Sequence, residues 1–464
     1  MRRFCTTGAV RSQVRSKKVD LLKGPVTSSI VRLAVPIMAG SFLSLAYSLT
    51  DMFWVGRLGT QAVAAVGTGG LLMWVSDGIL SIMRIGGQVH CGQSYGRGKI
   101  DEVRCYGRES LRLGYFAALL LFLVYFFAAG PIISIFNFNE AGTHSNSIVY
   151  LQVSSFGLFA TFGGRILSSL LTTVGNSKSP FIANAVGLVA NMILDPLMIT
   201  TMNMGVFGAA LATVIAQIIV LLILLVVAKK DEIFSNLRLF SKAIIWSRVR
   251  DILRIGLPAG LQSLIRSTVT IVVSRMVVRF GDLSVAVQRF GSQVESISWL
   301  TADGFGSAVS AFMSQNYGAE QGKRMKQGYR SASAIVIIIC IFSTVILYFF
   351  AADITAMFMA EPEAIAGGKD YLQILSASQI LLGLEIITIA AFSALGQTRF
   401  TAIVSTVFIG ARIPMSAWLS STSLGVNGIW WTMTITTNLV SLVFIFAFFS
   451  YMRKLERELV IDFS

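Results

Sequence analysis

Long apolar runs separated by short polar breaks recur along almost the whole chain. About 20 predominantly apolar residues are needed for a helix to cross a bilayer. The runs are continuous, whereas the strands of a membrane barrel alternate between apolar and polar residues over about ten positions. The pattern therefore predicts twelve membrane-spanning helices, with the approximate ranges 28–57, 62–92, 108–134, 146–173, 179–203, 206–228, 250–280, 284–314, 331–358, 366–395, 399–422 and 425–452.

Composition supports this prediction of an all-α polytopic membrane protein. Hydrophobic residues make up 54% of the 464 residues and charged residues only 13%, against about 25% charged residues in soluble domains. A water-soluble fold could not bury so much apolar surface. Helices satisfy the hydrogen bonds of their own backbone, which lipid requires of any spanning segment.

The net charge of +15 raises the question of a nucleic-acid partner, which the positions of the basic residues answer. They gather in the N-terminal tail and in the loops after even-numbered helices, whereas the opposite loops offer little beyond Arg57, Arg279 and Lys369. By the positive-inside rule both termini face the cytoplasm, as an even helix count requires. We therefore expect a membrane-lipid environment and no nucleic-acid partner. The basic positions include Arg2, Arg3, Arg11, Arg15, Lys17, Lys18, Lys23, Arg97, Lys99, Arg104, Lys178, Lys229, Lys230, Arg238, Lys242, Lys323, Arg324, Lys326 and Arg399.

Residues 1–27 are interpreted as a basic cytoplasmic tail, because they lack the apolar core of a secretory signal. An organelle transit peptide is the alternative. The four cysteines show no CxxC spacing, so neither a disulfide framework nor a zinc site is indicated. Residues 318–323 have the wrong spacing for a P-loop, and the two histidines lie far apart in sequence. We therefore expect no enzymatic activity and no cofactor.

The chain repeats itself at a constant offset of 222 residues. Such self-similarity indicates an internal duplication of six helices, and an even number per repeat makes the two repeats parallel. We predict an N-lobe at 28–228, a cytoplasmic linker at 229–249, a C-lobe at 250–452 and a cytoplasmic tail at 453–464. The matching positions are Pro36 with Pro258, Arg57 with Arg279, Gly59 with Gly281, and 93–96 with 315–318; 205–208 matches 425–428 at an offset of 220.

Ionisable residues inside a span cost about 2.5 to 3.5 kcal/mol each, so each of them needs a reason. Asp51 and Asp195 lie at a shared depth, about 10 to 12 Å below the outer surface at 1.5 Å per residue. Tyr47 and Asn191 each precede one of these aspartates by one helical turn, and Thr213 reaches the same depth. These oxygen-bearing side chains could converge on a hard cation such as Na⁺, or the carboxylates could exchange a proton. Alternatively, Asp51 is a residue of the membrane rim beside Arg57, and Asn191 with Asp195 only ties neighbouring helices together.

Pro196 adds a candidate ligand, since a proline cannot donate to the carbonyl of Met192. The C-lobe is expected to lack such a site, because the position equivalent to Asp51 is Val273. Glu295 and Glu385 are candidate substrate or C-lobe contacts. For each of the remaining charges inside the spans, structural ion pairing or placement at the membrane interface is expected, with substrate contact as the alternative. These charges include Asp77, Arg84, Arg165, Arg266, Arg275, Asp303 and Arg412.

The chain resembles the multidrug and toxic compound extrusion family, and its prokaryotic DinF-like branch in particular. The motifs that carry the resemblance are LAVPIMAG at 33–40, DMFWVGRLG at 51–59, AVAAVG at 62–67, GQSYGRG at 92–98, SQNYGAEQG at 314–322, NMILDPLMI at 191–199 and GVFGAALATVIAQ at 205–217. The resemblance implies a two-lobe antiporter with a cation site in the N-lobe. The family's residues there match Asp51, Asn191, Asp195 and Thr213, and Tyr47 matches a polar position one turn before the aspartate. Helix 7 offers arginines where the NorM-like pattern has an acidic residue, which leaves Glu385 as the acidic candidate of the C-lobe.

Together these features predict a secondary active antiporter of a prokaryotic inner membrane. It would export cationic or amphipathic drugs in exchange for Na⁺ or H⁺, as a monomer, by alternating access of its two lobes. A flippase for lipids or lipid-linked oligosaccharides is the first alternative. A membrane-embedded enzyme or a channel is the second, which the lack of a clustered nucleophile or histidine disfavours.

Overall fold

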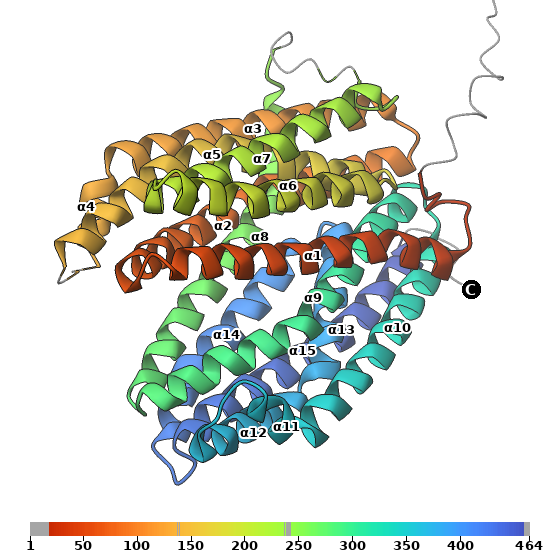
Figure 1. The fold of residues 1–464 in the computed structure, drawn as a ribbon. Coiled ribbons are helices and arrows are strands. Elements are labelled where there is room, and N and C mark those ends of the chain that lie inside the picture. The colour runs from red at the N-terminus through yellow and green to blue at the C-terminus, as the bar shows by residue number, and fades with distance from the viewer. Residues whose placement is uncertain (1–17, 137, 139, 236, 238–242, 459–464) are drawn as a thin grey trace, which may run out of the picture.

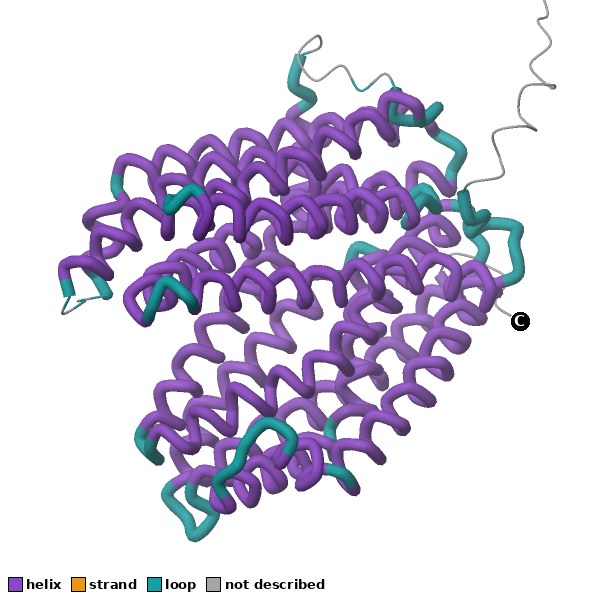
Figure 2. The backbone as a smooth tube through the Cα atoms, in the orientation of Figure 1, coloured by secondary structure: helices purple, strands orange, loops and turns teal. Residues whose placement is uncertain are grey.

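The computed structural model describes all residues except 1–17, 137, 139, 236, 238–242 and 459–464. Most of the basic tail, the last residues of the chain, Arg238 and Lys242 therefore lie outside the described residues. In the described part all regular elements are helical and are joined by short loops (Figure 2). The all-α prediction is confirmed there.

Each half of the chain supplies six spans. The first half contains α1 (Val26–Gly56), α2 (Thr60–Gly96), α3 (Ile100–Phe127), α4 (Ala129–Ser134), α5 (Ala141–Thr173), α6 (Lys178–Pro196), the π-helical η2 (Leu197–Thr201) and α7 (Gly205–Lys230). The second half contains α8 (Trp246–Val278), α9 (Asp282–Gly318), α10 (Gly322–Phe349), α11 (Ala351–Ala356), α12 (Pro362–Ser376), α13 (Gln379–Ala394), α14 (Thr398–Ser420) and α15 (Val426–Glu458).

Ten of the described helices are long and apolar enough to cross a membrane, and α12 with α13 forms a further span bent by 49°. The remaining predicted span, 284–314, corresponds to α9, whose 37 residues include Arg289, Glu295 and Asp303 and are less apolar. The predicted ranges 108–134 and 331–358 are wrong at their start, since α3 and α10 begin at residues 100 and 322. Charged first turns continue these helices outside the apolar run, where hydropathy gives no signal.

The duplication extends to the bounds of the helices. The elements α2, α3 and α4 begin and end 222 residues before α9, α10 and α11. The backbone repeats in detail: Gly59 and Gly281, which precede α2 and α9, have φ of 97° and 92°. A side chain is strained in this left-handed region, which explains why glycine is kept at both positions.

The two lobes meet at the end of the molecule where the described chain begins and diverge towards the other end (Figure 1). Two helices cross between them. The first turns of α1 bury Ile30 and Leu33 in the core of the C-lobe with Phe312, while the outer half of α1 packs against α6. In the same way Ile252 of α8 is buried in the core of the N-lobe.

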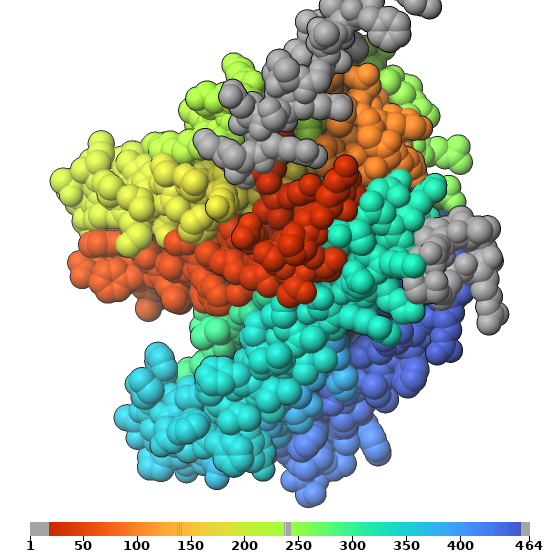
Figure 3. Space-filling view, turned by 90° about the vertical axis from the view of Figure 1, so that its right-hand side faces the viewer, coloured from red at the N-terminus to blue at the C-terminus, as the bar shows by residue number. Residues whose placement is uncertain are grey.

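The joined end is held by contacts that repeat with the duplication. Gln93 of α2 donates to the carbonyl of Ala394 at 2.8 Å, and Gln315 of α9 donates to the carbonyl of Thr173. Each glutamine therefore reaches the end of a helix in the opposite lobe. Figure 3 shows the start of α1 and α10 side by side on this face.

Candidate functional site

The five candidate residues of the N-lobe lie together where α1, α6 and α7 face one another. The hydroxyl of Tyr47 donates to Thr213 Oγ1 at 2.9 Å, which joins α1 to α7. Asn191 Nδ2 donates to Asp195 Oδ1 at 3.0 Å along one turn of α6. Asp51 lies close enough to Asp195 and to Tyr47 for electrostatic interaction. The five side chains that the sequence places near one depth are therefore neighbours in space.

Three oxygens of this group are buried and have no hydrogen-bond partner: Asp51 Oδ1, Asn191 Oδ1 and Asp195 Oδ2. Asn191 and Asp195 are fully buried, with 0% exposure. Buried acceptors without a partner are rare and costly, because they lose hydration and gain nothing. Carboxylate, amide and hydroxyl oxygens are the donors that a hard cation prefers, and the carboxylates can also take up a proton. The donor set fits either coupling ion.

The group contains two carboxylates and no histidine or cysteine. No cluster of three or more His, Cys, Asp or Glu side chains suited to a metal ion occurs among the described residues. A strongly held transition metal is therefore not indicated by these side chains, while a weakly held monovalent ion needs no such cluster.

Pro196 marks the point where α6 changes its winding. The α-helix ends at this residue and continues as the π-helical turn η2. The hydroxyl of Thr200 donates to the carbonyl of Pro196 at 2.5 Å. Because π-helical turns are uncommon and often found at functional sites, the distortion directly after Asp195 marks this part of α6 as specialised.

Tyr150 of α5 belongs to the same group and was missed in the sequence. It is 8% exposed and interacts electrostatically with both Asp51 and Asp195. Its ring packs against Gly69 of α2, where an added Cβ would overlap the ring. A count of helical depth from the outer end of α5 could have found this tyrosine, since it lies near the start of that helix.

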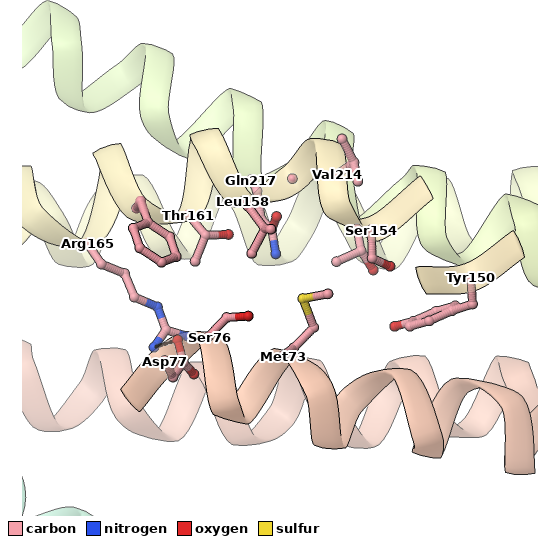
Figure 4. A pocket seen from close by; sticks show the side chains of 13 residues that line it. Met73, Ser76, Asp77, Tyr150, Ser154, Leu158, Thr161, Arg165, Val214 and Gln217 are labelled. Atoms are coloured by element: carbon pink, nitrogen blue, oxygen red, sulfur yellow. Dashed lines mark ion pairs between the residues drawn. The ribbon is translucent and has the colours of Figure 1, made fainter. Parts of the chain in front are cut away.

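A pocket extends from this group into the N-lobe between α2, α5 and α7. It has about 510 Å³ of space outside the protein atoms, solvent at its mouth included, and Thr213 and Tyr150 are among its lining residues. Figure 4 shows Tyr150 at one end and Arg165, which reaches from α5 towards Asp77 of α2, at the other. Arg165 Nη1 and Asp77 Oδ1 form an ion pair of 3.0 Å.

Glu295 and Glu385 lie in the C-lobe, apart from the cation group. Glu385 Oε1 is 3.6 Å from the guanidinium of Arg266, and its other oxygen accepts a hydrogen bond from Ser441 at 3.3 Å. Glu295 accepts a hydrogen bond from Gln379 at 3.2 Å. Both glutamates have protein partners, whereas Asp51 Oδ1 and Asp195 Oδ2 are buried without one.

The C-lobe counterpart of the cation group is apolar. Val273, which stands where the N-lobe has Asp51, is 4% exposed and belongs to a hydrophobic cluster with Val269 and Trp430. Tyr371 packs against Gly291 there, as Tyr150 packs against Gly69 in the N-lobe. The two lobes therefore share the tyrosine and the glycine, whereas the position of Asp51 is a valine in the C-lobe.

Comparisons with known proteins agree with this architecture. The MatE family model matches residues 36–197 and 258–418, one segment in each lobe. The probable multidrug resistance protein YpnP of Bacillus subtilis is 27% identical over 89% of this chain and 93% of its own length. The probable multidrug resistance protein NorM of Thermotoga maritima is 24% identical over 87% of this chain and 88% of its own length.

A solved structure described as an outward-facing conformation of a multidrug resistance MATE family transporter superposes with a TM-score of 0.88 at 22% identity. The superposition covers 95% of this chain and 99% of that structure, which establishes the same twelve-helix fold. Because the family model accounts for more than half of the residues and for both lobes, the chain belongs to the MatE family of multidrug and toxic compound extrusion proteins.

Proposed function

We propose that this protein is a secondary active antiporter that exports cationic or amphipathic compounds in exchange for Na⁺ or H⁺. The observation that carries the proposal is the group of three buried, unpartnered oxygens on Asp51, Asn191 and Asp195. Negative charge inside a bilayer is tolerated where an ion or a proton regularly neutralises it. The names of the relatives, which describe multidrug resistance, support export of drugs as the work done with that ion.

The arrangement of the lobes supports an outward-facing state. The end at which the lobes meet carries basic residues such as Arg97, Lys99, Lys230 and Arg324, which by the positive-inside rule lie on the cytoplasmic side. The lobes then diverge towards the outside of a prokaryotic inner membrane. In this state the coupling ion enters from outside, where its electrochemical potential is higher.

Coupling requires that the ion and the substrate affect each other's affinity, and this effect is reciprocal. Filling the site between Asp51 and Asp195 reorganises the contacts between α1, α6 and α7. The same change lowers the affinity for a bound drug, which leaves to the outside. No covalent step is needed, and the protein works as a monomer because each chain contains both lobes.

Efflux of ethidium from cells that lack other drug pumps tests the proposal. The Na⁺ and H⁺ gradients are collapsed separately, and retention of the dye is recorded for each. Asp51→Asn and Asp195→Asn should each abolish efflux at unchanged expression, because the amide can neither bind the ion strongly nor take up a proton.

Glu385→Gln is the matched control, since this carboxylate is also buried but has Arg266 and Ser441 as partners. It should keep the dependence on the ion gradient. Full efflux in both aspartate variants, or efflux that is insensitive to both gradients, would refute the coupling assignment. A lipid flippase remains the alternative, and transfer of a fluorescent lipid between leaflets without any drug efflux would favour it.

A further inference from the structure

The ion pair between Asp77 and Arg165 lies in the N-lobe pocket. The proposed ion site, formed by Asp51, Asn191 and Asp195 and called the coupling group below, gives this pair no role. Resting on the function proposed above, we propose that Asp77 binds the positively charged group of the transported compound. Arg165 occupies this position while no substrate is bound. The ligand class is an organic cation with an apolar body, such as a quaternary ammonium or a protonated amine.

The position of the pair argues for more than a structural role. Asp77 lies in the middle of α2, where a carboxylate is costly without compensation. A guanidinium at 3.0 Å supplies that compensation. The substrate can take over the carboxylate only if it supplies positive charge in place of Arg165, which selects for cations.

The exposure of the pair supports exchange of Arg165 for a substrate cation. The side chains of Arg165 and Asp77 are 58% and 37% exposed, whereas those of Arg108 and Glu109, another ion pair of the N-lobe, are 7% and 0% exposed. Exposed pairs are weak, because water screens the charges and holding a long side chain costs entropy. An incoming cation therefore displaces Arg165 at little cost.

The walls of the pocket offer side chains that suit the rest of such a ligand chemically. Met73, Leu158 and Phe162 contribute apolar surface, and Ser76 and Thr161 contribute hydroxyl groups. Figure 4 shows Met73 and Ser76 between Tyr150 and the ion pair. An adaptable methionine beside one fixed charge suits a site that accepts varied compounds with a common positive group.

Thr213 connects this subsite to the coupling group. It lines the pocket and also accepts the hydrogen bond from Tyr47. A cation held by Asp51 and Asp195 therefore lies beyond the Thr213 end of the pocket that contains Asp77, and its positive charge repels that of a bound substrate. The geometry makes ion and substrate mutually unfavourable without any contact between them.

The test measures binding of ethidium, a permanent cation, to the purified full-length protein in nanodiscs by fluorescence anisotropy. Asp77→Asn should weaken binding by about tenfold or more, a factor that corresponds to about 1.4 kcal/mol. The affinity of Asp77→Glu for ethidium should stay close to that of the wild type, because the carboxylate is kept. Arg165→Gln should tighten binding by up to about fivefold, because the competing cation is gone.

Asp101→Asn is the matched control, since Asp101 forms an ion pair of 3.1 Å with Arg104 at an exposed position outside the pocket. It should leave the affinity unchanged. Equal weakening in Asp77→Asn and Arg165→Gln would show a structural ion pair and overturn the inference. If Asp77→Asn does not fold, the direction of the Arg165→Gln effect decides: tighter binding supports the proposal and weaker binding overturns it.

The outcomes separate this inference from the proposed function. If the wild type neither binds nor exports ethidium under either gradient, drug antiport itself is refuted. If the wild type exports ethidium and Asp77→Asn binds it with wild-type affinity, only the role of Asp77 fails.

Discussion

At the residue scale, two glycine and tyrosine pairs give a natural comparison between the lobes. Tyr150 packs against Gly69 beside the coupling group, and Tyr371 packs against Gly291 in the C-lobe. At both positions the tyrosine ring occupies the space that the Cβ of any other residue would need. Only Tyr150 interacts with Asp51 and Asp195, because the C-lobe has Val273 instead of the first aspartate.

Gly69→Ala should therefore disturb ion coupling as well as packing. The added methyl overlaps the ring of Tyr150 and pushes it towards the carboxylates, at a cost of about 1 to 3 kcal/mol in stability. We expect efflux to need a steeper ion gradient than in the wild type. The measurement is ethidium efflux at a series of imposed Na⁺ and H⁺ gradients, together with the melting temperature.

Gly291→Ala makes the same overlap with Tyr371 and serves as the control. Its melting temperature should fall by a similar amount, whereas the gradient needed for efflux should stay unchanged. A similar loss of coupling in both variants would mean that Tyr150 acts through general packing.

At the scale of the elements, α2 and α9 meet by their last turns. An added Cβ at Gly96 would overlap the carbonyl of Gln315, and one at Gly318 would overlap that of Gln93. Glycine is required here because two backbones touch. The hydrogen bonds of Gln93 and Gln315 to the opposite lobes join the same end, so opening the molecule at this end must break both.

Gly96→Val should prevent this contact and favour the state in which the joined end is open. An overpacking cost of about 1 to 3 kcal/mol changes the ratio of two conformations by a factor of about 5 to 150. Hydrogen–deuterium exchange should become faster in the last turns of α2 and α9. Gly67→Ala, in the same helix but with no atom within 4 Å of the added Cβ, should leave exchange there at the wild-type rate.

At the scale of the whole molecule, the lobes are joined by more than the linker between them. Lys18 forms an ion pair of 2.6 Å with Asp231, and the amide of Val19 donates to the carbonyl of Gly175 at 2.9 Å. Leu21, 1% exposed, is then buried in the core of the C-lobe. This segment before α1 therefore connects both lobes at the end where they meet.

The joined end is predicted to face the cytoplasm. A fluorescent protein that matures only in the cytoplasm should fluoresce when fused after residue 464. Alkaline phosphatase, which is active only outside the cytoplasm, should be active when fused within 421–425, the loop between α14 and α15. The opposite pattern would reverse the orientation and with it the outward-facing assignment.

Much of the architecture could be read from the sequence, because its causes are local. The apolar runs set the spans, and the offset of 222 residues between the halves reappears in the bounds of α2 and α9. The depth of a residue in the membrane followed from the rise of a helix, and it placed Asp51, Asp195 and Thr213 at one level. The bend between α12 and α13 was not foreseen, since no proline lies at the break.

What the tertiary structure decided is the direction in which each helix faces. Lipid is as apolar as the side chains it surrounds, so the rotation of a helix is set by packing and hydrogen bonds with its neighbours. Depth alone could not show that Tyr150 joins the coupling group, that Asp77 and Arg165 meet in a pocket, or that the start of α1 is buried in the C-lobe. The sequence determined which residues enter the membrane and at what level, and the contacts between helices determined which of them face one another.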